Sequence, residues 1–257
     1  MSGFNRSEST SFIQKHLKRN YTFNTFDGIF YFLGLIFLHR QNVLPVFISK
    51  LGGSNFAVSL IPVLHNMGVF FPSIFIASYL QSLSKKQPYI LKMGLLQRFP
   101  WLIAALLSFF IAGLYPDAMV IVLLTTVFTV AIATGLAVPA FFNFTAKTIP
   151  ITMRGKLFAL RNMGSYLLGL AMGGLMSYLM SVISFPYNYS TLLVCGFFFI
   201  MLSELSLALI KEPESSEVIP HMEMSRFLKS IPEKLKQNPN FIGFMIGRAL
   251  YSVAFLS

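Results

Sequence analysis

The chain has 257 residues, of which 55% are hydrophobic and only 11% are charged, and its net charge is +11. Soluble domains have about 25% charged residues, so this composition excludes an ordinary water-soluble globular protein and indicates a membrane protein with several spans. The basic residues stand in short gaps between long apolar runs, as topology signals do, which argues against a nucleic-acid-binding domain. The single Cys195 excludes an internal disulfide and a cysteine-based zinc cluster.

Residues 1–22 are polar and basic, and the apolar stretch that follows them is too long for the core of a signal peptide. We therefore expect an N-terminal tail followed directly by a first span. Crossing the hydrocarbon core takes roughly 20 apolar residues as a helix. Residues 23–210 are predicted to form an all-α, polytopic bundle of six complete spans, at about 25–49, 55–80, 90–115, 118–144, 158–184 and 191–210.

A polar linker over 211–240 follows the sixth predicted span. Within it, SRFLKSIPEKLK (225–236) has the pattern of a short amphipathic surface helix. Residues 241–257 are apolar again and are predicted to be the start of a seventh span, truncated where the sequence stops.

The distribution of Lys and Arg predicts the orientation. Seventeen of the 20 Lys and Arg residues lie in the tail and in the second, fourth and sixth connections, whereas the other three connections hold only Lys50. Arg98 and Arg161 are among the seventeen, assigned to the second and fourth connections. Because positive residues accumulate on the cytoplasmic side, we expect a multi-pass protein of a plasma (inner) membrane with a cytoplasmic N-terminus.

The first predicted span contains four consecutive polar residues, His39 to Asn42. A span that ended before them would be too short, so Arg40 is expected near the bilayer midplane, where it needs a partner or a wet cavity. Pro45 has no N–H and leaves the carbonyl of Gln41 without its helical partner, which predicts a kink in the helix.

The second span carries His65 and Asn66 at a depth similar to that of Arg40, because this span runs in the opposite direction. We predict that these polar groups line a central cavity and contact a polar solute, with an anion as one option. The alternative is that they satisfy one another and the freed carbonyls, with no ligand role. The candidate cavity residues are Arg40, His39, Gln41, His65 and Asn66.

The second span ends in ASYLQSLSKK, residues 77–86. This stretch resembles the gating loop between helices two and three of the major facilitator superfamily, which has a small residue, an acid, a base, Gly and two bases. Ala77 matches the small residue and Lys85 and Lys86 match the basic pair, whereas Gln81 stands at the position of the acid. A second stretch, IPITMRGKLFALRNMGSYLLG, resembles the connection into helix five of the same family.

The resemblance implies the N-terminal half of a solute transporter that works by alternating access, without cofactor, metal or catalysis. Its partners would be the lipid bilayer, a small-molecule solute and a second six-helix half, either a missing C-terminal half or another subunit. The alternatives are a non-transporting fragment, a half-transporter that needs a partner, or a membrane enzyme. An enzyme is disfavoured because the chain has few acid–base groups that could converge.

The fifth and sixth spans and the start of the first contain further small and acidic residues that could have a role. Small residues four apart let helices approach closely, so Gly169, Gly173 and Gly174 in the fifth span are predicted to serve helix packing. Gly174 stands where the family's antiport signature has a proline, which gives no support to drug–proton antiport. Asp27 and Glu204 are candidates for ion coupling, although Asp27 has the alternative of pairing with a nearby Lys or Arg, and the family's sixth helix is peripheral.

Overall fold

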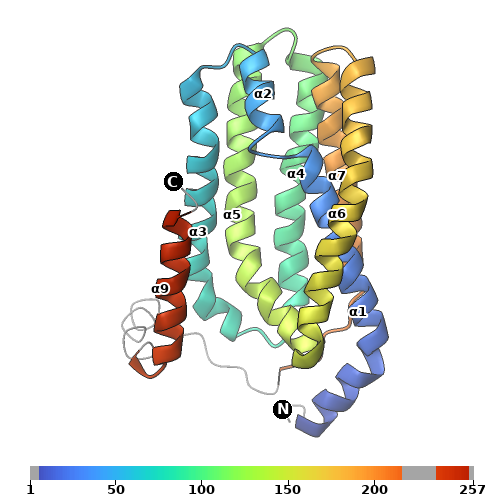
Figure 1. The fold of residues 1–257 in the computed structure, drawn as a ribbon, viewed down its shortest axis with the longest axis vertical. Coiled ribbons are helices and arrows are strands. Elements are labelled where there is room, and N and C mark those ends of the chain that lie inside the picture. Colours follow the sequence, from blue (N-terminus) through green and yellow to red (C-terminus); the bar gives the residue numbers. More distant parts are fainter. Residues whose placement is uncertain (1–5, 216–235, 255–257) are drawn as a thin grey trace.

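A computed structural model describes residues 6–215 and 236–254, and every regular element within them is a helix (Figure 1). Most of the predicted linker, the amphipathic helix predicted within it and the last three residues lie outside these ranges. The helices stand side by side along one axis. They are α1 (Arg6–Phe37), α2 (Val43–Lys50), α3 (Asn55–Gln81), α4 (Gln87–Ile111), α5 (Pro116–Thr148), α6 (Ile151–Val182), α7 (Tyr187–Ala208) and α9 (Pro239–Ala254).

Five of these helices, α3 to α7, are long and apolar enough to cross a membrane. They correspond to the second to sixth predicted spans, with ends that differ by several residues. The chain is therefore an integral membrane protein with a helical bundle, as its composition predicts. The predicted count of six complete spans and a seventh is not confirmed, since neither α1 nor α9 is among the five.

The predicted first span is two helices rather than one. α1 already begins at Arg6, within the predicted tail, and ends at Phe37, and α2 begins at Val43. The carbonyl of His39 accepts hydrogen bonds from the N–H groups of Val43 (2.8 Å) and Leu44 (3.2 Å), which starts the new helix. Figure 1 shows that this break lies partway along the bundle and not at one of its ends.

Pro45 is the third residue of α2. N–H groups in the first turn of a helix have no intrahelical partner, so a proline costs no hydrogen bond at this position. The prediction of a kinked, continuous helix at Pro45 is therefore wrong. The proline stands just inside a new helix, and the polar residues before it form the break.

The bundle has a packed interior and two exposed helices. α1 packs against α6 and α7, α3 against α5, and α4 against both α5 and α7. Fully buried Phe37, Phe47 and Leu123 belong to the core. In their apolar segments α3 and α6 have only 11% and 6% of their residues buried, against 39% to 44% in α4, α5 and α7, so most of the surface of α3 and α6 is free for lipid or a partner.

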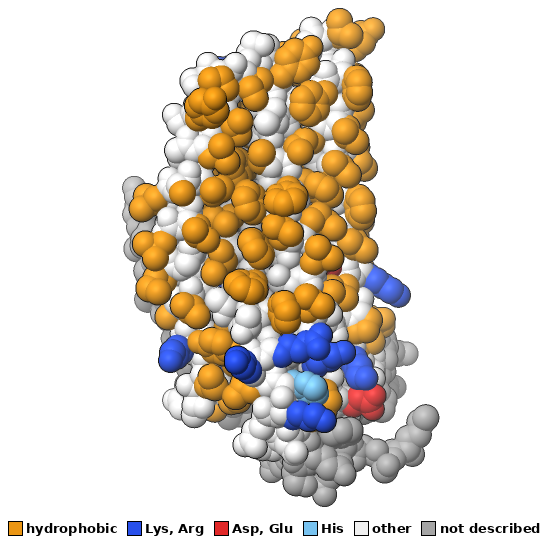
Figure 2. Space-filling view, turned by 90° about the vertical axis from the view of Figure 1, so that its right-hand side faces the viewer, with side chains coloured by type: hydrophobic (Ala, Val, Ile, Leu, Met, Phe, Trp, Pro, Cys, Tyr) orange, Lys and Arg blue, Asp and Glu red, His pale blue; other side chains and the backbone are white. Residues whose placement is uncertain are grey.

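Lys and Arg side chains gather toward one end of the bundle, below a largely apolar face (Figure 2). We call it the basic end: it comprises the first part of α1, the α3–α4 and α5–α6 junctions, and the residues after α7. Arg98 and Arg161 do not belong to it, because both are buried inside the bundle (3% and 6% exposed). Their assignment to connections was wrong.

Candidate functional site

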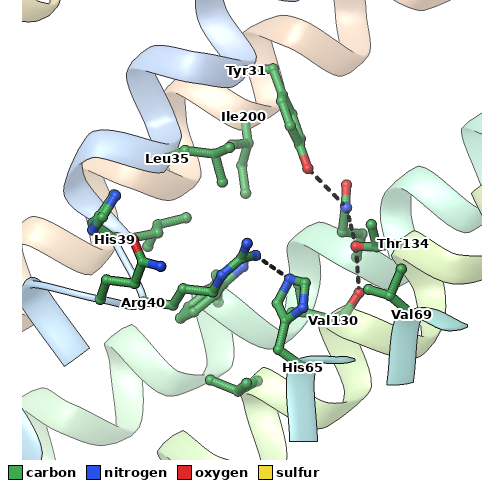
Figure 3. Close-up of a pocket in the computed structure, with 14 residues that line it drawn as sticks. Tyr31, Leu35, His39, Arg40, His65, Val69, Val130, Thr134 and Ile200 are labelled. Carbon is green, nitrogen blue, oxygen red and sulfur yellow. Dashed lines mark hydrogen bonds between the residues drawn. The ribbon is translucent and has the colours of Figure 1, made fainter. Parts of the chain in front are cut away.

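A cavity of about 260 Å³ lies beside the break between α1 and α2 (Figure 3). The break supplies His39, Arg40 and Gln41, and α3 supplies His65. Apolar side chains from α1, α3, α4, α5 and α7 form the rest of the wall, together with three uncharged polar residues, Tyr31, Gln97 and Thr134. We call this cavity the Arg40 pocket.

Arg40 and His65 point toward each other across the pocket, and Nη1 of Arg40 hydrogen-bonds to Nε2 of His65. A guanidinium only donates, so this ring nitrogen accepts, and the neutral imidazole carries its hydrogen on Nδ1. That Nδ1, like Nδ1 of His39, is buried and has no hydrogen-bond partner within residues 6–215 and 236–254. None of the ion pairs among the described residues involves Arg40.

A layer of uncharged polar groups borders the pocket. Nε2 of Gln97 donates to the Tyr31 hydroxyl (3.2 Å) and to Oγ1 of Thr134 (2.6 Å). The Thr134 hydroxyl in turn donates to the carbonyl of Val130 (2.7 Å). Tyr31 and Gln97 also line a second cavity of about 290 Å³, which contains the other charged groups of the interior. The layer therefore stands between the two cavities.

The first interior ion pair joins α1 to α6. Nη2 of Arg161 lies 3.0 Å from Oδ2 of Asp27, and Nη1 of Arg161 hydrogen-bonds to Asn24. The other carboxylate oxygen of Asp27 accepts a hydrogen bond of 2.7 Å from Ser203 in α7. Three helices thus meet at this carboxylate, and both of its oxygens have partners.

The second pair joins α4 to α7. Nη1 of Arg98 lies 2.9 Å from Oε2 of Glu204, while Nε of Arg98 donates to the carbonyl of Ile200 (2.6 Å) and Nη2 to Ser203 (3.2 Å). Neither oxygen of Glu204 has hydrogen-bond geometry to a partner, so the contact with Arg98 is an ion pair by distance alone. Ser203 links this pair to the first one.

The structure brings together four of the five predicted cavity residues: Arg40, His39, Gln41 and His65. The fifth, Asn66, is exposed and does not line the pocket. Asp27 pairs with an arginine, one of the alternatives for it. Glu204 is buried and pairs with Arg98. It therefore lies inside the bundle, although the sixth helix of the family is expected to be peripheral.

Sequence reasoning did not single out Tyr31, Gln97, Thr134 or Ser203, and it placed Arg98 and Arg161 in connections. A signal for Arg98 was present. It stands in LLQRFPWL, where apolar residues continue on both sides, and it falls within the predicted span 90–115 itself.

The predicted gating loop contacts the segment after α7 through an ion pair and hydrogen bonds. Ala77 and the exposed Gln81 belong to α3, and Lys85 forms an ion pair of 3.0 Å with Glu214. The buried Glu212 carboxylate accepts from the backbone N–H groups of Lys86 (2.8 Å) and Gln87 (2.8 Å), which caps α4.

Lys147 completes this arrangement, with its ammonium 3.0 Å from Glu212. Burial and the Lys147 ammonium both lower the pKa of the Lys86 side chain, against an opposing effect of Glu212. A carboxylate from the linker therefore sits beside a loop that has Gln81 at the acid position of the family pattern.

The three glycines predicted for helix packing differ in their surroundings. A Cβ at Gly169 would lie 3.1 Å from Cδ1 of Ile36, where α6 meets α1. A Cβ at Gly173 or Gly174 would meet no atom within 4 Å. These two glycines therefore face outward from α6.

The chain matches no protein-family model, and comparison with curated proteins and with solved structures gives no match either. A function has to be inferred from the residues and the geometry described above.

Proposed function

We propose that the chain is the N-terminal half of a major-facilitator-like transporter and that a small polar solute binds in the Arg40 pocket. The observation that carries this proposal is the helix break at residues 38–42, whose polar side chains line a cavity among membrane helices. Irregular backbone at membrane depth is tolerated only inside protein or along a water-filled cavity. Secondary transporters bind their solutes at such interrupted helices.

The depth of the pocket supports the proposal. His65 follows Asn55, the first residue of α3, by about ten residues, which corresponds to roughly 15 Å at 1.5 Å per residue. Half of a hydrocarbon core of about 30 Å is the same distance. Solute sites of secondary transporters lie near this midplane.

A second half would complete the pathway. Arg40, Gln41 and Asn66 are exposed, and polar groups at this depth are costly in contact with lipid. The outward surfaces of α3 and α6 offer room for a partner, either the half that begins with α9 or another copy of the chain. Under this proposal the basic end faces the cytoplasm, following the positive-inside rule.

The test is uptake into proteoliposomes that contain the full chain, with a panel of radiolabelled carboxylates, amino acids and sugars. We expect saturable uptake of at least one solute and its loss in Arg40→Ala at equal insertion. Arg19→Ala is the matched control, since this arginine lies at the basic end and donates to the Leu209 carbonyl. No uptake of any panel member would contradict a pathway built from copies of this chain and favour the fragment alternative or a half that needs a different partner, whereas full uptake by Arg40→Ala would contradict a solute site at Arg40.

A further inference from the structure

We propose that the Arg40 pocket selects small monocarboxylates, that is, anions with one carboxylate and a compact apolar body. Binding of this class presupposes the solute site proposed above. The inference specifies the charge, the head group and the size of that solute.

The first reason is charge balance inside the bundle. Arg98 and Arg161 each have a carboxylate at 2.9 or 3.0 Å, whereas Arg40 has none among the described residues. A charge at membrane depth requires a partner or a water-filled cavity. One guanidinium without an acid calls for one negative charge, which a monoanion supplies and a neutral sugar does not.

The second reason is the set of hydrogen-bonding groups. A guanidinium presents five N–H donors in a planar fork that matches a carboxylate. Among the described residues Arg40 uses one of these donors, toward His65. Nδ1–H of His65 adds a donor without a partner. None of the described residues that line the pocket is Asp or Glu, so a cationic ligand would find no counter-charge.

The third reason is the size and polarity of the cavity. Its volume of about 260 Å³ is below the roughly 300–1,000 Å³ of pockets that hold drug-sized ligands. Much of the wall is apolar, with Leu35, Val69, Val127 and Trp101 among its members. A halide would leave this apolar wall without contact, and a short hydrocarbon body would cover it.

Trp101 provides the measurement, because it is the single tryptophan of the chain and lines the pocket. The purified full chain in lipid nanodiscs would be titrated with sodium butyrate, butyramide, butylammonium and inorganic phosphate, with Trp101 fluorescence and calorimetry as two readouts. We expect saturable binding of butyrate. Butyramide should bind about 10- to 100-fold more weakly, as expected when hydrogen bonds lose their charge assistance.

Variants of the pocket arginine assign the selectivity. Arg40→Gln should remove the preference for butyrate over butyramide, and Arg19→Gln should leave it unchanged. Arg40→Lys keeps the charge without the fork, so it should keep the preference with lower affinity, and it serves as the second variant if Arg40→Gln does not insert.

Equal binding of butyrate and butyramide, stronger binding of butylammonium or phosphate, or no butyrate binding in either readout would overturn the inference. Its failure and that of the transport proposal are distinguishable. Butyrate binding without uptake into liposomes would contradict only transport by copies of this chain, whereas uptake without charge preference would contradict only the anion class.

Discussion

The charged side chains inside the bundle occupy two regions that differ in how the charges are compensated. Between α1, α4, α6 and α7, two arginines face two carboxylates, and Ser203 links the pairs. At the break between α1 and α2, Arg40 has a neutral histidine as its partner and borders a cavity. The first region is compensated within the described part of the chain, whereas under the proposal above the second receives its negative charge from a ligand.

The difference separates two uses of an interior charge. Charges held by helix-to-helix pairs fix which helices pack and in which register, and removing one partner leaves the other uncompensated. A charge without a partner at the edge of a cavity contributes little to packing and is available to a ligand. Changes in the two regions should therefore affect different measurements.

The largest effect is expected for Asp27→Ala, which leaves the buried Arg161 without a counter-charge. Breaking a buried ion pair on one side costs about 3–5 kcal/mol, so the free energy of unfolding in mixed micelles should fall by about this amount. Ser203→Ala is the control, because it keeps all four charges and removes only a hydroxyl that donates to Asp27 and accepts from Arg98, at about 1.5–3 kcal/mol for hydrogen bonds to charged groups. Equal effects of the two variants would show that the pair is not a structural unit.

A smaller effect is expected for Gly94→Ala. A Cβ at Gly94 would lie 2.6 Å from the carboxyl carbon of Glu204, so the carboxylate would have to move relative to Arg98. Overpacking of this kind costs about 1–3 kcal/mol, measurable as a lower thermal midpoint of unfolding in detergent.

Gly173→Ala is the matched control, since a Cβ there meets nothing within 4 Å. We expect it to leave stability unchanged or to raise it by about 0.5–1 kcal/mol, because alanine is the better helix former. A loss of stability at Gly173 would instead indicate that a second copy of the chain covers this face of α6.

Glu212→Gln tests a third carboxylate, which is buried but lies at the basic end. The amide should still cap α4 with its oxygen but not pair with Lys147, at a cost of about 1 kcal/mol. Amide hydrogen exchange at Lys86 and Gln87 should then be about fivefold faster, with Glu214→Gln as the control because its partner Lys85 is exposed. Unchanged exchange at these two amides would contradict a contribution of the Lys147–Glu212 pair to the stability of this helix end.

The positions of the five apolar helices α3 to α7 were predictable from the sequence because each depends on a local quantity, the length of an apolar run. The polar residues of the break were also recognisable, since HRQN interrupts such a run. The form of the break was not, because Pro45 is compatible both with a kink and with the first turn of a new helix, and only the hydrogen bonds of His39 distinguish the two.

Partners across helices could not be predicted in the same way. The pairing of Arg98 with Glu204 depends on the rotation and register of α4 against α7, which apolar periodicity alone does not fix. Glu212 is a similar case, because a polar linker residue gives no sign of the helix end that it caps. The polar layer at Gln97 joins three helices through side chains that are unremarkable one at a time.

The smallest effect on stability is expected for Arg40→Gln, and it separates the two regions most directly. Because Arg40 has no acid as partner among the described residues, its removal leaves none of their charges uncompensated. The free energy of unfolding of the unliganded variant should lie within about 1 kcal/mol of the wild-type value, because the main cost is the loss of one hydrogen bond to His65. A loss of unfolding free energy as large as that of Asp27→Ala would show that Arg40 stabilises the fold, as the paired arginines do.

Ligand should widen the stability difference between the wild type and Arg40→Gln. A ligand that binds only the folded state stabilises it by about 2.7 kcal/mol at 100 times its dissociation constant. Saturating butyrate should therefore raise the unfolding free energy of the wild type and leave Arg40→Gln unchanged, whereas Asp27→Ala, if it remains folded, should still respond. Since the paired region is distinct from the pocket, the loss of stability and the loss of ligand response should occur in different variants.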